Sequence, residues 1–234
     1  MKILLVIHGY PPHYMAGSEV YTFNLASELM HHAEVAVFTR VENPYEPEYS
    51  CEDSHEKKIW VRRVNKPFRD YTFRDKYEDS RMEDSFRAML AVFNPDIVHI
   101  GHLSHLSTNL PIIASNEFKI PVVFTAHDFW MGCWRGQRVD PKLKICSGPD
   151  VDRCLACAKH YYKDWVNPEE IERFLGQMKR VLKAIDLFLA PSKTVCRFLR
   201  EQGVPEVKIK HAPYGFRKDK VAAIKESDEK IKGQ

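Results

Sequence analysis

The sequence lacks any long hydrophobic run. No apolar stretch among its 234 residues approaches the about 20 residues that a transmembrane helix needs. The opening run, residues 2–7, is too short for a signal peptide, and His8 and Gly9 end it without a small-residue cleavage pattern. We therefore expect a cytoplasmic protein, in which cysteines are thiols or metal ligands more often than disulfides.

An excess of charge of one sign is also missing. The chain has 35 Lys and Arg against 32 Asp and Glu, which gives a formal net charge of +3 with neutral histidines. Nucleic-acid-binding domains concentrate positive charge on one face, so this balance argues against a zinc-ribbon-like nucleic-acid binder, and we expect no nucleic-acid partner. Internal repeats are absent, as are the glycine motifs G-x-G-x-x-G and the P-loop.

What the sequence does contain is a regular alternation of apolar runs and amphipathic segments. β-rich runs are typical of strands in a covered sheet, and they predict strands at residues 2–7, 34–39, 59–64, 96–100, 121–125, 186–190 and 207–211. Helices are expected at residues 18–30, 71–93, 106–118, 168–185 and 192–200, and a surface loop at 41–57. Strands alternating with helices predict an α/β fold with a doubly wound, Rossmann-like parallel sheet.

The loop from His8 to Glu19 joins a predicted strand to the start of a predicted helix. A helix N-terminus offers free N–H groups and a positive dipole end to an anion, and Ser18 is the expected N-cap. Gly17 would let a phosphate approach the backbone closely. A glycine required only by the turn explains the same residue equally well.

A histidine and a carboxylate, His127 and Asp128, directly follow the strand predicted at 121–125. Open α/β sheets bind ligands beyond the carboxyl ends of their strands. There His127 can donate a hydrogen bond to a sugar hydroxyl or a phosphate oxygen. The alternative is a histidine whose hydrogen bonds are satisfied within the packing of its own loop.

The segment 128–166 is a long polar loop that holds four of the six cysteines of the chain, Cys133, Cys146, Cys154 and Cys157. The C-x-x-C spacing of the last two places two thiolates on one metal, and four soft ligands suit tetrahedral zinc. An iron–sulfur cluster uses the same four cysteines, and buried thiols or a pair of disulfides also stay open. A metal here would be structural, because the loop lacks a core of its own.

Four stretches of the sequence form an ordered set: KILLVIHGYPPHYMAGSEVYTFNLASEL, NPDIVHIGHLSH, IPVVFTAHDFW and AIDLFLAPSKTVCRFLREQGVPEVKIKHAPYGF. In this order they resemble the N-terminal half of GT-B fold glycosyltransferases, specifically the large retaining family 4. The segment HDFWMGCWRGQ, with the cysteines that follow it, is similar to a subset of those enzymes that carry cysteines in this loop.

The resemblance implies an acceptor-side Rossmann-like domain at residues 1–216 that includes the cysteine-rich loop. Residues 217–234 would then be a linker or tail towards a missing C-terminal donor-binding domain. The implied site residues are Gly17 and Ser18 for the donor diphosphate, His127 for the reacting sugar, and His8, Tyr10, His102 and Asp128 for the acceptor. Ala16 departs from the family, since many members have a second glycine there.

The implied activity is transfer of a hexose from a nucleotide-sugar to a glycan or lipid-linked acceptor with retained configuration, as in polysaccharide biosynthesis. The resemblance implies no metal in the chemistry. Because the donor-binding half would be missing, we expect this chain to be inactive by itself. A lipid-linked acceptor would bring it to the inner face of a membrane. The alternative, from a different functional class, is a non-catalytic, metal-stabilised, Rossmann-like binding module.

Overall fold

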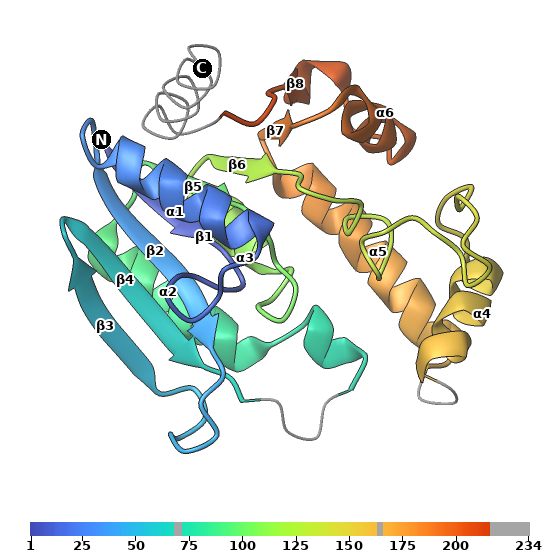
Figure 1. The fold of residues 1–234 in the computed structure, drawn as a ribbon, viewed down its shortest axis with the longest axis horizontal. Helices are drawn as coiled ribbons and strands as arrows, with labels where there is room; N and C mark the ends of the chain where they lie inside the picture. The colour runs from blue at the N-terminus through green and yellow to red at the C-terminus, as the bar shows by residue number, and fades with distance from the viewer. Residues whose placement is uncertain (68–71, 163–165, 216–234) are drawn as a thin grey trace, which may run out of the picture.

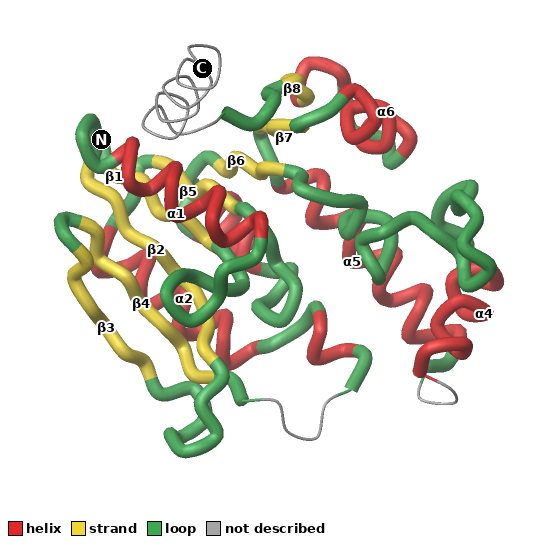
Figure 2. The backbone as a smooth tube through the Cα atoms, viewed as in Figure 1, coloured by secondary structure: helices red, strands yellow, loops and turns green. Residues whose placement is uncertain are grey.

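The computed structural model describes residues 1–67, 72–162 and 166–215. Its centre is one eight-stranded sheet with the strand order β3-β4-β2-β1-β5-β6-β7-β8 (Figures 1 and 2). The strands are β1 (Lys2–Val6), β2 (Glu34–Val41), β3 (Cys51–Glu56), β4 (Ile59–Asn65), β5 (Ile97–Ile100), β6 (Val122–Thr125), β7 (Leu187–Ala190) and β8 (Ile209–His211). Neighbouring strands are parallel except β3, which pairs with β4 in the antiparallel sense. The predicted α/β fold with a largely parallel sheet is confirmed.

Helices connect the strands. They are α1 (Gly17–Leu29), α2 (Ser80–Phe93), α3 (Leu110–Ile112), α4 (Val151–Tyr162), α5 (Pro168–Ala184) and α6 (Lys193–Glu201), with short 3-10 helices η1 (Arg74–Lys76) and η4 (Glu206–Lys208) and the π-helix η2 (Ile113–Glu117). None of the helices in the described part of the chain is long and apolar enough to cross a membrane. The predicted starts of α5 and α6 are confirmed, because Asn167 and Ser192 cap them by accepting backbone hydrogen bonds at 2.9 and 3.2 Å.

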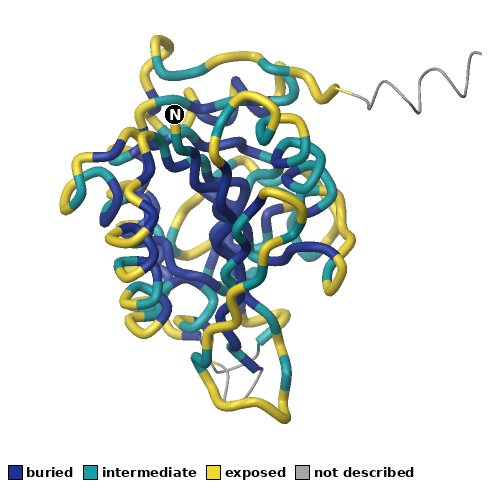
Figure 3. Tube along the Cα trace, turned by 90° about the vertical axis from the view of Figure 1, so that its left-hand side faces the viewer, coloured by how far each residue is buried: buried dark blue, intermediate teal, exposed yellow. Residues whose placement is uncertain are grey.

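Hydrophobic side chains pack on both faces of the sheet. Successive residues of a strand point to opposite faces, and in β1 this divides Ile3 and Leu5 from Leu4 and Val6. The first pair packs in a smaller core with Ala26 of α1, and the second in a larger core that includes α2, α5 and α6. Figure 3 shows the buried central chain segments with more exposed segments around them.

The order of the strands creates a switch point between β1 and β5. From β1 the chain moves outward to β2 and β4, and then returns to lay down β5, β6, β7 and β8 on the other side. In open α/β sheets, ligands bind outside the carboxyl ends of the strands at such a point. The loops after β1 and β5 therefore occupy the position where the fold most readily forms a site.

The surface loop predicted at 41–57 was wrong, because its second half forms the edge strand β3. This strand has no buried apolar face that could give a period-two signal. It pairs with β4 through an antiparallel backbone ladder, and charged side chains add contacts between the two strands. Arg62 donates two hydrogen bonds to Asp53 at 2.8 and 2.6 Å, and Arg63 pairs with Glu56.

Two predicted helices begin later than expected. The helix predicted at 71–93 starts after Asp79, whose carboxylate accepts a backbone hydrogen bond of 3.0 Å as its N-cap; residue 71 lies outside the described residues. The helix predicted at 106–118 starts at α3, because Thr108 is still in a loop and bonds to the carbonyl of Tyr77 through its N–H and its hydroxyl, both at 2.8 Å.

The segment 128–166, predicted as a loop, contains the helix α4, which carries Cys154 and Cys157 and packs against α5. Asp150 accepts a hydrogen bond from the N–H of Arg153 at 3.0 Å at the start of this helix. The polar composition of the segment conceals a short amphipathic helix. The tail predicted at 217–234 lies outside the described residues.

Candidate active site

A cavity of about 1190 Å³ lies at the carboxyl ends of the central strands. His8 follows β1, His102 follows β5 and His127 follows β6, and all three line this cavity. Because β1, β5 and β6 are adjacent and parallel, residues separated by more than one hundred positions in the sequence meet there. Gly17, Ser18 and Asp128, also predicted as site residues, line the same cavity.

The side of the cavity formed by α1 holds a histidine–carboxylate pair. Nε2 of His8 lies 3.1 Å from Oε1 of Glu19, whose side chain is almost fully buried. Burial lowers the pKa of His8 more than the contact with Glu19 raises it, so His8 is neutral at pH 7 and donates from Nε2. Burial raises the pKa of Glu19, but the hydrogen bonds from His8 and Ser18 outweigh it and hold that pKa at about 2.

A second pair follows on the opposite side. Nδ1 of His102 accepts a hydrogen bond from the N–H of Ser104 at 3.1 Å, which leaves Nε2 as the donor to Asp128 at 3.4 Å. Burial raises the pKa of Asp128, but the hydrogen bond from His102 outweighs burial and brings that pKa below its ordinary value. The rings of His8 and His102 lie 4.6 Å apart, so the two pairs form one continuous polar chain across the cavity.

His127 is held by an aromatic residue from the far end of the described chain. Its Nδ1 lies 2.6 Å from the hydroxyl of Tyr214, and the ring of Tyr21 packs edge-on against it at 4.9 Å. Nε2 of His127 is covered and has no hydrogen-bond partner among the described residues. Burial, with a smaller contribution from the neighbouring His102, lowers the pKa of His127 to about 4, so His127 is a neutral imidazole at pH 7.

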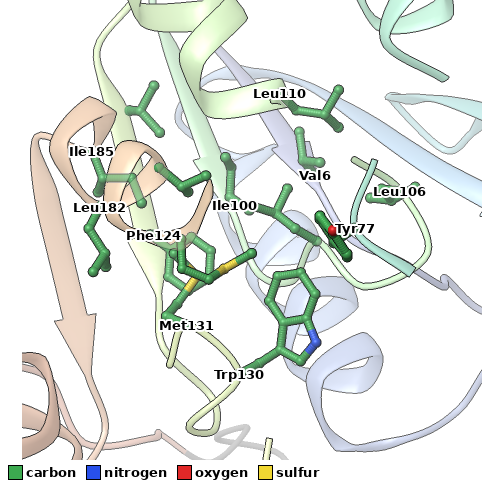
Figure 4. Close-up of a cluster of buried hydrophobic side chains, with 14 of the residues drawn as sticks. Val6, Tyr77, Ile100, Leu106, Leu110, Phe124, Trp130, Met131, Leu182 and Ile185 are labelled. Carbon is green, nitrogen blue, oxygen red and sulfur yellow. The ribbon is translucent and has the colours of Figure 1, made fainter. Parts of the chain in front are cut away.

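The loop that carries His127 is anchored in the larger core. Trp130 and Met131 are only 3% and 2% exposed. They pack near Phe124 of β6 and Ile100 of β5 (Figure 4). This anchoring fixes where the chain leaves the sheet, so the position of His127 is set by the core and not by loop contacts alone.

The N-terminus of α1 differs from the predicted one, because Ala16 and not Ser18 occupies the N-cap position, with no side-chain cap. The Ser18 hydroxyl instead donates to Glu19 at 2.9 Å. The first N–H groups of the helix, from Gly17 onward, have no intrahelical partners. A Cβ added at Gly17 would meet nothing within 4 Å and its φ is not positive, so neither space nor the turn requires a glycine.

Tyr10 is the one predicted site residue that does not line the cavity. It is 1% exposed in the smaller core, where its ring contacts Phe23 at 5.8 Å. Several lining residues were not predicted as site residues, among them Glu19, Tyr21, Arg40, Lys76, Arg135 and Tyr214. Only Arg40 had a usable signal, since it stands at the carboxyl end of a predicted strand.

The four cysteines of the segment 128–166 line a separate cavity of about 290 Å³. All four are free thiols, and burial raises the pKa values of Cys154 and Cys157. The described residues contain no group of three or more His, Cys, Asp or Glu side chains arranged to hold a metal ion. The structure thus brings the predicted ligands to one place but does not show the predicted metal site.

Residues 15–220 match the family model described as Glycosyltransferase Family 4. The chain belongs to glycosyltransferase family 4. This confirms the resemblance found in the sequence. A comparison of this family 4 chain with curated proteins finds no match.

Solved structures of GT-B enzymes share the fold of this family 4 chain. Sucrose-phosphate synthase from Thermosynechococcus elongatus superposes with a TM-score of 0.59 at 17% identity, covering 92% of this chain and 48% of the other. The catalytic domain of Starch Synthase IV from Arabidopsis thaliana, bound to ADP and acarbose, gives a TM-score of 0.54 at 13% identity, covering 93% and 52%. The chain spans about half the length of these structures and corresponds to one half of a GT-B enzyme.

Proposed function

We propose that this chain, over residues 1–216, is the acceptor-side half of a retaining hexosyltransferase, which moves a hexose from a nucleotide-sugar to a glycan or lipid-linked acceptor on the cytoplasmic side of the membrane. The observation that carries the proposal is the convergence of His8, His102 and His127 on one cavity at the switch point of the sheet. The family and the GT-B fold support the same reaction class.

On the donor side, the proposal assigns Gly17 and Ser18 to the diphosphate. Their N–H groups open the helix α1 at the cavity wall, where a helix N-terminus favours an anion. The absence of a steric need for glycine at position 17 supports a role in close ligand approach. Because the chain spans about half the length of the GT-B structures that it matches, we propose that the other diphosphate contacts come from a second half and that this chain is inactive by itself.

On the acceptor side, the proposal assigns His8, His102 and Asp128 to hydroxyl groups of the acceptor. His127 meets the reacting sugar as a neutral imidazole, because burial lowers its pKa to about 4. It therefore orients the sugar through hydrogen bonding and does not supply a positive charge. Asp128 is ionised, and a carboxylate accepts hydrogen bonds from sugar hydroxyls.

For the cysteine-rich segment we propose a structural zinc held by Cys133, Cys146, Cys154 and Cys157. The donor set fits in type and number, since four thiolates suit tetrahedral zinc, and all four line one cavity. A bound zinc would supply folding stability to the segment and no step of the transfer. An iron–sulfur cluster on the same ligands is the alternative.

The test is a turnover assay on the complete natural protein with a panel of nucleotide-sugars, following transfer to an acceptor and the anomeric configuration of the product. We expect donor-dependent transfer with retention. His127→Ala should lower turnover by about 100-fold or more, the range seen when one transition-state contact is removed, while circular dichroism shows an intact fold. His55→Ala is the matched control, because His55 is exposed on the edge strand β3.

Full turnover in His127→Ala would remove His127 from the site. A complete protein that transfers no sugar from any donor would instead support the alternative, a non-catalytic Rossmann-like binding module. A product with inverted anomeric configuration would support transferase activity but contradict the proposed retention of configuration.

A further inference from the structure

Three basic side chains form one wall of the large cavity. Arg40 is the penultimate residue of β2, Lys76 ends η1, and Arg135 lies in the loop after β6. All three line the cavity. They come from segments far apart in the sequence, so no local motif places them together. We call Arg40, Lys76 and Arg135 the basic wall.

Arg40 is the most buried member of the basic wall, with 7% of its surface exposed. Its Nη1 pairs with Glu42, while its Nε has no hydrogen-bond partner among the described residues. The ring of Tyr14 lies 5.8 Å from the guanidinium carbon. An arginine that is more than nine-tenths buried with a free donor is costly to leave unpaired, and a ligand in the cavity would complete its hydrogen bonding.

Lys76 and Arg135 form no ion pair with a carboxylate within the described ranges 1–67, 72–162 and 166–215. Nζ of Lys76 lies 5.4 Å from the ring centre of Trp134. The guanidinium carbon of Arg135 lies 3.9 Å from the ring centre of Tyr161. The same guanidinium donates a hydrogen bond to the carbonyl of Val139 at 3.2 Å. These contacts fix the positions of the two cations without neutralising them.

The carboxylates that line the same cavity form no ion pair with Lys76 or Arg135 among the described residues. Glu19 is engaged by His8 and Asp128 by His102, and Glu28 lies on α1. The charge of Asp128 acts on Lys76, but the two do not form an ion pair.

His105 also lines the cavity, near the basic wall. Its pKa falls to about 3, first through burial and then through the charges of Arg40, Lys76 and Lys66. Lys66 is paired with Asp79 at 2.6 Å and Arg40 with Glu42, so Lys76 and Arg135 are the members of the basic wall that have no ion pair among the described residues.

We propose that the basic wall binds a phosphate group carried by the acceptor, so that this enzyme glycosylates a phosphorylated acceptor. This inference rests on the proposed function. A phosphate ester carries about −1.5 to −2 charges at pH 7 and three strong acceptor oxygens. Arginine forks match such oxygens in pairs and lysine adds a point charge. A soluble sugar phosphate and a phosphate-linked lipid both present this group.

The proposal gives the cysteine-rich segment a part in the site. Arg135 follows Cys133 by two residues, and Tyr161, on which it lies, belongs to α4 of the same segment. The thiol of Cys157 also contacts Arg135. The segment therefore places one of the three phosphate-binding cations, and its folding is coupled to the choice of acceptor.

The test is binding of glucose 6-phosphate and of glucose to this chain by isothermal titration calorimetry, with no donor present. We expect the phosphate to bind at least tenfold more tightly than the neutral sugar, and its affinity to fall as salt rises. Lys76→Met and Arg135→Gln should each weaken it by roughly tenfold, the effect of one hydrogen bond to a charged group, while Lys76→Arg retains binding. Lys58→Met and Arg197→Gln are matched controls, since both residues are exposed and outside the cavity.

A second arm separates the two sources of phosphate. Phosphatidylcholine vesicles with and without phosphatidic acid are sedimented with the wild-type chain and with Lys76→Met. Binding that requires phosphatidic acid and Lys76, with weak affinity for glucose 6-phosphate, identifies a lipid-borne phosphate.

The proposal is overturned if neither the sugar phosphate nor the acidic vesicles bind better than their neutral counterparts. It is equally overturned if folded Lys76→Met and Arg135→Gln bind as the wild type does. These results leave the transferase intact, because the turnover assay with His127→Ala measures sugar transfer and not phosphate binding. Conversely, a complete protein that binds phosphate but turns over no nucleotide-sugar would support the proposed phosphate site and contradict the proposed transferase activity.

Discussion

The hydroxyl of Tyr214 lies 2.6 Å from Nδ1 of His127, and the two rings stack with an interplanar angle of 25°. The two residues are 87 positions apart in the sequence. Tyr214 follows β8, the last strand of the sheet, whereas His127 follows β6. Because Nε2 of His127 is covered, Tyr214 occupies the nitrogen that a sugar would otherwise reach, and it must shift or share that contact when a substrate binds.

Tyr214→Ala should raise the pKa of His127 from about 4 towards its ordinary value of 6.5, because burial is the main cause of the low value and the Tyr214 ring supplies part of that burial. The measurement is an NMR titration of the histidine ring signals of this chain. Tyr45→Ala is the control, since Tyr45 is 94% exposed and should leave the titration unchanged. An unaltered His127 pKa in Tyr214→Ala would show that the tyrosine does not shield the ring.

Gly17→Ala should leave the free energy of unfolding unchanged or slightly higher, because the added Cβ meets nothing and alanine favours a helix. In the complete protein the same change should raise KM for the nucleotide-sugar by about tenfold, since a methyl group then stands where the diphosphate approaches the backbone. Urea unfolding and donor-dependent kinetics measure the two effects. Equal KM values for Gly17→Ala and wild type would take Gly17 out of the donor site.

Gly101→Ala should destabilise the fold by about 1–3 kcal/mol, the usual cost of overpacking a core. Its Cβ would come within 3.0 Å of both Ile7 Cδ1 and Thr22 Oγ1, and 3.7 Å from Nε2 of His127. Gly176→Ala is the matched control. Gly176 lies in α5 with open space around it, so alanine there should stabilise by roughly 0.5–1 kcal/mol. Chemical denaturation of both variants tests the pair, and destabilisation by Gly176→Ala would contradict the reasoning.

The chain should lose stability on acidification below pH 6.5, in part through His99. Burial lowers the pKa of His99 to about 4. Between this value and the ordinary value of 6.5, the unfolded chain binds a proton that the folded chain does not. The stability contribution is therefore complete above pH 6.5 and is lost as the pH falls through about 4, by up to about 1.4 kcal/mol per pH unit.

Urea unfolding of wild type and His99→Gln at a series of pH values checks this expectation. The variant should show a shallower loss of stability with acid, and His32→Gln, at an exposed position, should retain the wild-type slope. His105 and His127 also have lowered pKa values, so some acid sensitivity will persist. Identical slopes in His99→Gln and wild type would contradict the prediction.

Purified protein should contain one zinc per chain, and removal of the zinc with a chelator should lower the thermal stability of the cysteine-rich segment. Cys157→Ser should lose the metal, whereas Cys51→Ser should keep it, because Cys51 is exposed on β3, away from the other cysteines. Elemental analysis gives the metal and its stoichiometry. Bound iron with visible absorbance would show that the segment holds an iron–sulfur cluster and not zinc. Four titratable thiols without bound metal would show that the segment holds no metal site.

Local sequence patterns were sufficient for most of the sheet and for the helix starts at Asn167 and Ser192, because burial on one face and capping are local properties. They also placed His8, His102 and His127 at strand ends. They failed for β3, whose charged residues carry no burial period, and for α4, whose polar composition resembles a loop.

Only the tertiary structure decided which of these side chains meet. Three adjacent parallel strands carry the histidines to one cavity, while Tyr10, a neighbour of His8 in sequence, turns into the core. The basic wall and the contact of Tyr214 with His127 join residues from separate elements. The sequence alone determined most of the elements and the strand ends that carry the histidines, because these depend on near neighbours. The strand order determined the composition of the site, because it depends on contacts between distant segments.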